Sequence, residues 1–255
     1  MDSKTAEILS TINSGFYYDN HASFSATRKT AWPGWERCLA LLEEELLADT
    51  QSLSVFDLAC GNLRFRDFLI SALPGYTLNY HAVDNCDLLV PQTAAVSYQN
   101  LDILDTLQKK RSLKSLIQAP PCDLCVCFGF LHHVPLQEYR EALLSTLVEL
   151  ARPGGCVIVS FWQYLSNVAL AAKARDSHQR ALEELGLTCL EGLGDNDLLL
   201  GWADTPGAYR YCHSFSDPEI DHLLASIARR TTLLSRFTSD GRGSNLNTYV
   251  VFRTS

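Results

Sequence analysis

The sequence contains no long apolar run and little positive charge. No segment approaches the roughly 20 consecutive apolar residues that a membrane-spanning helix needs, and the first residues lack the charged-then-apolar pattern of a signal peptide. Asp and Glu (29) outnumber Lys and Arg (21), so the formal net charge is −8. Proteins that bind nucleic acid through many phosphates usually have a basic face. The charge argues against a large RNA substrate but leaves room for a local basic patch, and we expect a soluble, cytoplasmic protein without a membrane partner.

The cysteines show neither a disulfide framework nor a zinc pattern. There are nine, an odd number, and several lie inside apolar runs. Cys122 and Cys125 form a CxxC, but no second pair stands at zinc spacing, and the motif falls in an expected buried strand. We predict reduced, buried thiols that act as small hydrophobic residues, with no metal and no disulfide-linked partner.

Short apolar runs alternate with helical stretches from residue 53 onward. Such alternation predicts a parallel sheet with helices on both faces, a Rossmann-like α/β fold. With 47% hydrophobic residues, the 255-residue chain has enough apolar surface for one core. We expect a single domain over 1–255, divided into a helical cap (1–50), a core (53–162), an insert (163–208), and C-terminal strands with a helix (209–255).

The segments outside the core give more local expectations. Pro33 fits the start of a helix, and Asp19 and Ser25 are possible N-caps before it. In the insert we expect a helix over 173–185, a Gly/Asp-rich loop over 191–207 and then a strand over 208–215. The last two strands, 231–238 and 247–254, are joined by a glycine-rich turn that predicts a hairpin.

The first strand of the core ends in an acidic residue and a glycine turn. Asp57 stands near the strand end, and Gly61 follows where the chain turns into a helix. The dinucleotide fingerprint GxGxxG is absent, because Asn62, Leu63 and Arg64 follow Gly61. Together with the C-terminal hairpin, this argues against an NAD-dependent oxidoreductase.

Polar side chains also end the next strands. Asp84, at the end of the second strand, is placed to accept hydrogen bonds from both hydroxyls of a ribose. Asp102, after the third, suits an adenine amino group, and Ile103 an apolar wall. The alternative is that each Asp is only a helix N-cap. Because the carboxyl ends of parallel strands share one edge of the sheet, we expect these residues to form one nucleoside site.

The ordered motifs of the core resemble those of class I S-adenosylmethionine-dependent methyltransferases. The matching stretches are DLACGN, AVDN, LDI, GFLHHV and LARPGG, which span residues 53–162. The resemblance implies a seven-stranded sheet in the order 3-2-1-4-5-7-6 with strand seven antiparallel, the cofactor S-adenosyl-L-methionine and the product S-adenosyl-L-homocysteine. The cofactor-binding residues would be Tyr18, Arg28, Trp32, Asp57, Ala59, Cys60, Gly61, Asn62, Asp84, Asn85, Leu101, Asp102, Ile103, Phe128, Gly129, Phe130 and His133.

Segments outside the core resemble a narrower group, the tRNA wobble-uridine methyltransferases that esterify a carboxymethyl side chain. The matches are FYYDNHASFSATRKTAWP, AYRYCHSF and the C-terminal DGRGSNLNTYVVF. Two positions depart from that group. Cys212 replaces its second tyrosine in Arg-Tyr-Tyr-His, and Leu63 replaces the last glycine of its Cys-Gly-Asn-Gly. The methyl acceptor therefore stays open between a tRNA and a small molecule.

Chemistry suggests roles for the remaining polar residues. A carboxylate nucleophile needs no base at neutral pH but does need cations, and Arg210 with His213 fit that role. In the alternative, Arg210 pairs with a surface acid and His213 only packs. An O- or N-methyltransferase would need a base, for which His133 is a candidate, although it equally fits a structural role. Arg28 would reach the methionine carboxylate if it shared a helical face with Trp32.

Two further expectations concern the whole site. The insert, the strand over 208–215 and the segment around Tyr17 should roof the cavity at the strand ends and line it with aromatic side chains. A catalytically inactive cofactor-binding module is the remaining alternative, because Leu63 removes a glycine from the first turn.

Overall fold

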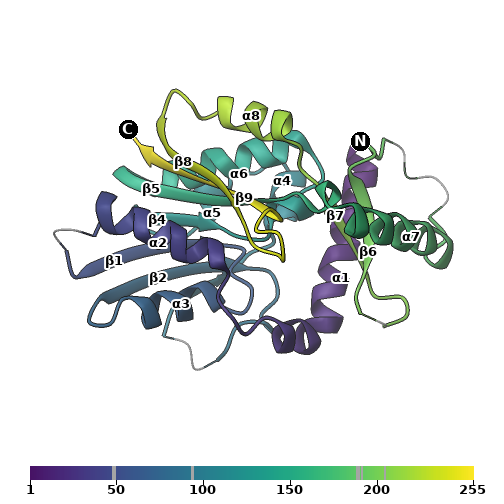
Figure 1. The fold of residues 1–255 in the computed structure, drawn as a ribbon, viewed down its shortest axis with the longest axis horizontal. Coiled ribbons are helices and arrows are strands. Elements are labelled where there is room, and N and C mark those ends of the chain that lie inside the picture. Colours follow the sequence, from purple (N-terminus) through teal and green to yellow (C-terminus); the bar gives the residue numbers. More distant parts are fainter. Residues whose placement is uncertain (48–49, 93–94, 188–189, 191, 204) are drawn as a thin grey trace.

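The computed structural model describes residues 1–47, 50–92, 95–187, 190, 192–203 and 205–255. Cys189 and parts of the expected loop over 191–207 lie outside this set. A seven-stranded sheet has the order β3-β2-β1-β4-β5-β9-β8. Strands β1 to β5 are parallel, and β9 is antiparallel to both of its neighbours. This confirms the predicted order and its single reversed strand (Figure 1). The strands are β1 (Ser52–Leu58), β2 (Thr77–Asp84), β3 (Ser97–Asn100), β4 (Cys122–Cys127), β5 (Ala151–Trp162), β8 (Thr231–Ser239) and β9 (Asn247–Thr254).

Helices cover both faces of this sheet. Because side chains alternate along a strand, β1 sends Phe56 and Leu58 into one apolar cluster and Leu53 and Val55 into another. The first cluster packs against α4 (Ile103–Gln108), α5 (Leu113–Leu116), α6 (Gln137–Leu150) and α8 (Asp217–Ala225). The second packs against α2 (Pro33–Glu45) and α3 (Arg64–Ala72). Each face of the sheet is therefore buried, as its nearly continuous apolar strands require.

A second layer of structure stands beside the carboxyl ends of the strands (Figure 1). It contains α1 (Ser3–Thr27), α7 (Val168–Glu184), and the antiparallel pair β6 (Asp197–Gly201) and β7 (Tyr209–His213). We call these four elements the roof. The short 3-10 turns η1 (Leu131–His133) and η2 (Tyr164–Ser166) lie next to β7 and α7, respectively.

Two local expectations were wrong. Helix α1 is capped by Asp2, whose side chain accepts from the Thr5 amide, and it continues through Asp19 and Ser25, so neither of these begins a helix. Residues 197–201 were expected in a loop, but their Asp-Leu-Leu-Leu-Gly run pairs with β7. No helix within the described part of the chain is long and apolar enough to cross a membrane.

Candidate functional site

A cavity of about 440 Å³ lies between the strand ends and the roof. This falls within the roughly 300–1,000 Å³ typical of small-molecule sites. Its walls come from the ends of β1, β2, β4 and β5, from the turn after β3, from α1 and β7, and from the β8–β9 hairpin. The predicted site residues that line it are Arg28, Trp32, Asp57, Ala59, Cys60, Gly61, Asn62, Asp84, Asn85, Leu101, Asp102, Ile103, Phe128, Gly129, Phe130, His133 and Arg210.

Two predicted residues are not brought to the cavity. The Tyr18 side chain is 65% exposed, and the neighbouring Tyr17 lines the cavity in its place. His213 is buried outside the cavity wall, with Nδ1 2.7 Å from Asp197 and Nε2 3.1 Å from Glu219. Its hydrogen bonds tie β7 to β6 and to α8. His213 therefore stabilises the roof through these hydrogen bonds and does not line the cavity.

The turn after β1 keeps a left-handed backbone without the second glycine. Gly61 has φ of +53°, and a Cβ built there would meet no atom within 4 Å, so the backbone faces open space. Leu63 has φ of +59° and is 1% exposed. Positive φ is uncommon for residues other than glycine and costs about 1–3 kcal/mol. Burial of the Leu63 side chain offsets that strain and preserves the turn.

Two buried carboxylates face the cavity from β1 and β2. Asp84 accepts from the amides of Gly61 (2.8 Å) and Cys86 (3.0 Å), and burial raises its pKa. Asp57 accepts from the Tyr80 hydroxyl at 2.6 Å. Burial, reinforced by the nearby Asp84, raises the pKa of Asp57 to about 7. Each carboxylate oxygen has two lone pairs, so Asp84 retains acceptor capacity for a ligand.

Asp102 is a helix N-cap that also lies on the cavity wall. Its Oδ1 accepts from the Asp105 amide at 2.9 Å, which makes it the N-cap of α4. Its Oδ2 accepts from Asn85 at 3.1 Å, and Asn85 also donates to Ser14 of α1 at 3.2 Å. The N-cap alternative therefore holds for Asp102, and the same side chain lies on the cavity wall beside a contact with the roof.

His133 is held through both of its ring nitrogens. Its Nδ1 is 2.7 Å from the Tyr211 carbonyl, and its Nε2 is 2.7 Å from the Tyr17 hydroxyl. A carbonyl only accepts, so Nδ1 carries the proton and Nε2 accepts from Tyr17. Burial, then the field of Arg210, lowers the pKa of His133 to about 3. A neutral ring with both nitrogens engaged favours the structural role over that of a general base.

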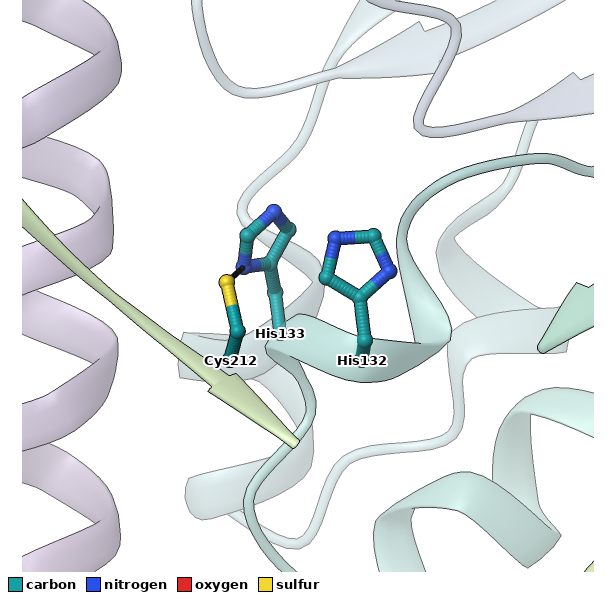
Figure 2. Close-up of side chains that lie close together, drawn as sticks. All are labelled: His132, His133 and Cys212. Atoms are coloured by element: carbon teal, nitrogen blue, oxygen red, sulfur yellow. Dashed lines mark hydrogen bonds between the residues drawn. The ribbon is translucent and has the colours of Figure 1, made fainter. Parts of the chain in front are cut away.

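His132, His133 and Cys212 place ligand-type atoms within 4.8 Å of one another (Figure 2). The Cys212 sulfur is 3.8 Å from Nδ1 of His133, the atom that donates to Tyr211. Burial raises the pKa of the Cys212 thiol to about 11, so it is protonated at neutral pH. In this arrangement Nδ1 of His133 and the Cys212 thiol both carry protons, which a metal would have to displace before either atom could act as a ligand.

Arg210 lines the cavity, and no described residue forms an ion pair with it. Its side chain comes from β7, is 8% exposed, and its Nε has no hydrogen-bond partner among the described residues. The guanidinium stacks on Phe16 and Trp202, 5.3 and 5.0 Å from their ring centroids. None of the ion pairs found in the described part of the chain includes Arg210. Arg210 therefore lies on the cavity wall, as predicted. The alternative, a surface ion pair, is not observed among the described residues.

Arg28 lines the same cavity but not in the way expected. Helix α1 ends at Thr27, so Arg28 and Trp32 do not share a helical face. Arg28 stacks on Phe24 and on Trp202, 5.2 and 5.5 Å from the centroids. Burial, then repulsion by Arg210, lowers its pKa. One indole thus supports two like charges on the roof side of the cavity.

Several wall residues were missed by the sequence analysis. They are Asn13, Ser14, Arg64, His132, Trp162 and Asp240. Asp240, in the β8–β9 hairpin, accepts from the Gly34 amide (3.0 Å), Asn247 (2.7 Å) and the Tyr249 hydroxyl (2.6 Å). These contacts join segments far apart in the sequence. The signal available in the sequence was the match of Asn247 to the wobble-uridine group.

Relatives in sequence are distant. No family model matches the chain. The tRNA (carboxymethyluridine(34)-5-O)-methyltransferase ALKBH8 of Macaca fascicularis is 25% identical over 180 residues, which are 66% of this chain and 23% of that protein. The chain therefore spans less than a quarter of that relative's length. A protein of Encephalitozoon cuniculi (strain GB-M1), named provisionally as a methyltransferase, is 25% identical over 202 residues, which are 78% of each chain.

Solved structures share the fold. The DhpI–SAM–HEP complex aligns with a TM-score of 0.58 at 17% identity, covering 96% of this chain and 97% of that one. Magnesium protoporphyrin IX methyltransferase (ChlM) from Synechocystis PCC 6803 with bound SAM has a TM-score of 0.53 at 13% identity, covering 100% and 98%. The sheet order is that of the class I S-adenosylmethionine-dependent methyltransferase fold, and the chain is distantly similar in sequence to part of ALKBH8.

Proposed function

We propose that the cavity binds S-adenosylmethionine and that the protein transfers its methyl group to an acceptor carboxylate. The proposed acceptor carboxylate rests on Arg210, a buried guanidinium on the cavity wall with an unpartnered Nε and no counter-ion in the described structure. An uncompensated buried cation is costly, so the site is suited to an anion that arrives with a ligand. The cofactor would supply a methyl group on a sulfonium.

The residues at the strand ends fit this cofactor. The backbone at Gly61 faces open space, and Asp84 beside it has acceptor capacity for two ribose hydroxyls. Asp102 would accept from the adenine amino group, with Leu101 and Ile103 as the apolar wall. On the roof side, Arg28 is a half-buried cation suited to the methionine carboxylate.

The acceptor side favours a nucleophile that is already ionised. Methyl transfer from a sulfonium needs alignment of the reactants and exclusion of water more than acid–base help. A carboxylate is ionised at neutral pH, and Arg210 would hold it by paired hydrogen bonds. His133 is neutral and fully hydrogen-bonded, which argues against an acceptor that must lose a proton to it.

The relative from Macaca fascicularis suggests one acceptor of this kind. Its name specifies carboxymethyluridine at tRNA position 34, and we propose the same side chain as the acceptor here. Phe24 and Tyr17 of α1, two aromatic residues of the cavity wall, would pack against a planar base.

A small free carboxylic acid is the second candidate. The observation in its favour is the net charge of −8, because the phosphates of a tRNA would meet an acidic protein. Both candidates use Arg210 in the same way and differ only in the size of the acceptor.

Calorimetric titration with S-adenosylmethionine and S-adenosylhomocysteine tests the cofactor. Transfer of a tritiated methyl group into fractionated cell extract then compares RNA with small metabolites. We expect label that mild base releases, because methyl esters hydrolyse readily. Failure to bind either cofactor form would overturn the proposal, and base-stable label would overturn the carboxylate.

A further inference from the structure

His132 and His133 are adjacent in the sequence but differ in their hydrogen bonding. Both nitrogens of His133 are engaged by Tyr17 and Tyr211. His132 lines the cavity, is 8% exposed, and has a buried Nδ1 with no partner among the described residues. Figure 2 shows its ring standing apart from the contact between His133 and Cys212. An unmet buried polar atom costs roughly 1–3 kcal/mol, a cost that a ligand can offset.

His132 lies beside β7, the strand that carries Arg210, because a nitrogen of its ring is within 4.8 Å of the Cys212 sulfur. Its ring meets the edge of Trp162, another wall residue, at 5.0 Å between centroids. Burial, followed by the fields of His133 and Arg210, lowers its pKa well below the ordinary value. The ring is therefore neutral at physiological pH. A neutral imidazole offers one donor and one acceptor, and it suits an uncharged polar group near the anion held by Arg210.

We propose that His132 is an acceptor-binding residue that hydrogen-bonds to an uncharged polar group of the acceptor, next to the carboxylate at Arg210. The inference rests on the proposed function and adds a second point of recognition to it. A site built to hydrogen-bond a substrate discriminates strongly against analogues that lack the group, because its own polar atom is then left unpaired. His132 would thus set which carboxylates are accepted.

Nitrogen NMR of the histidine side chains tests the assignment. S-adenosylhomocysteine is added first, then either 5-carboxymethyluracil or phenylacetate. Both probes carry a carboxymethyl group on a planar six-membered ring, but phenylacetate has no ring hydrogen-bonding groups. We expect 5-carboxymethyluracil to shift the His132 ring nitrogens and phenylacetate to leave them nearly unmoved. Lack of a His132 response to 5-carboxymethyluracil overturns the inference, and so does an equal response to the cofactor product alone.

Variants give an independent measurement. We expect His132→Leu to weaken binding of 5-carboxymethyluracil about three- to tenfold, the value of one neutral hydrogen bond, and to leave phenylacetate binding unchanged. His132→Gln should restore part of the difference. The matched control is His81→Gln on β2, because His81 also has a buried, unpartnered Nδ1 but does not line the cavity. Equal weakening of both probes by His132→Leu would indicate a structural role and overturn the inference. Failure of the proposed function would appear separately, as loss of cofactor binding in the unmodified protein.

Discussion

The two sides of the cavity are built in opposite ways. On the strand side, Asp57, Asp84 and Asp102 lie at or just after the ends of strands, and a hydroxyl or an amide donates to each of them. On the roof side, Arg28 and Arg210 come from opposite ends of the chain and stack on one indole, with no carboxylate paired to Arg210 in the described structure. The strand side is acidic and locally satisfied, whereas the roof is cationic and unsatisfied. This difference fits the proposed function, in which the strand side would hold the nucleoside of the cofactor and the roof would hold anionic groups, the methionine carboxylate at Arg28 and the acceptor at Arg210.

Removing the roof cation should have the largest effect. We expect Arg210→Ala to lower turnover by about thirtyfold to several thousandfold, since truncating one partner of a buried charge pair costs roughly 2–5 kcal/mol. Affinity for S-adenosylhomocysteine should stay within about twofold of the unmodified protein, because Arg210 is proposed to contact the acceptor and not the cofactor. Arg210→Lys, which keeps the charge but loses the planar fork, is the matched control. Normal turnover in Arg210→Ala would contradict the comparison.

Loosening the roof tests whether it folds as a distinct layer. Asn13 of α1 accepts from the Tyr211 amide at 2.7 Å and donates to the Tyr211 carbonyl at 3.2 Å. Asn13→Ala removes the side-chain acceptor of the buried Tyr211 amide, at roughly 1–3 kcal/mol, whereas the Tyr211 carbonyl keeps its hydrogen bond from His133. We expect faster hydrogen exchange at the Tyr211 amide, with the β1 and β4 amides unchanged.

The control for that variant lies on the same helix. Asn20→Ala removes a bond that stays within α1, from Asn20 to the Phe16 carbonyl, and should leave exchange at Tyr211 as it was. Equal acceleration of exchange across the main sheet in Asn13→Ala would show that roof and sheet unfold together.

Removing the Asp84 carboxylate on the strand side should weaken only the binding of the cofactor. We expect Asp84→Ala to weaken binding of S-adenosylmethionine and S-adenosylhomocysteine alike, by roughly 1.5–3 kcal/mol, the value of hydrogen bonds to a charged group. Isothermal titration measures both constants. Unchanged affinity would remove Asp84 from the site, and unequal losses would mean that Asp84 senses the methyl group.

The smallest expected effect is on the stability of the fold at low pH. The His213 hydrogen bond, the leading cause, lowers the pKa of Glu219 to about 2 from an ordinary 4.5. A depressed pKa stabilises the fold above about pH 4.5, and that contribution is lost as pH falls toward 2. Glu219 is partly exposed, so we expect Glu219→Gln to cost about 1 kcal/mol or less at pH 7. Denaturant unfolding across this range should show a shallower acid loss in the variant, and parallel curves would exclude the effect.

The strand side was predictable because its signals are local. Alternation of apolar runs and helices fixes the parallel strands, and in such a sheet the residues after each strand must meet at one edge. Gly61, Asp84 and Ile103 could therefore be assigned to one wall before any contact was known. Even the N-cap alternative for Asp102 could be stated in advance, because both roles follow from its position after a strand.

The roof was less predictable because its contacts are long-range. Choosing Tyr18 over Tyr17 is an error of one residue, which on a helix with 3.6 residues per turn rotates the side chain by about 100°. The aromatic residues on both sides of that stretch did not reveal which face was buried. His213 looked like a ligand of the acceptor until Asp197 and Glu219, from two other elements, were seen to hold it.

The turn after β1 has a consequence for how this sequence can change. Leu63 is left-handed and almost completely buried. Substitution of Leu63 by glycine would relieve the strain of the positive φ angle but would leave a void. Leu→Ala changes at buried sites alone cost roughly 2–5 kcal/mol. Nearby side chains would have to grow in the same step. A single substitution at position 63 is therefore expected to destabilise the fold, because the side chain that strains the backbone is also the one that fills the core.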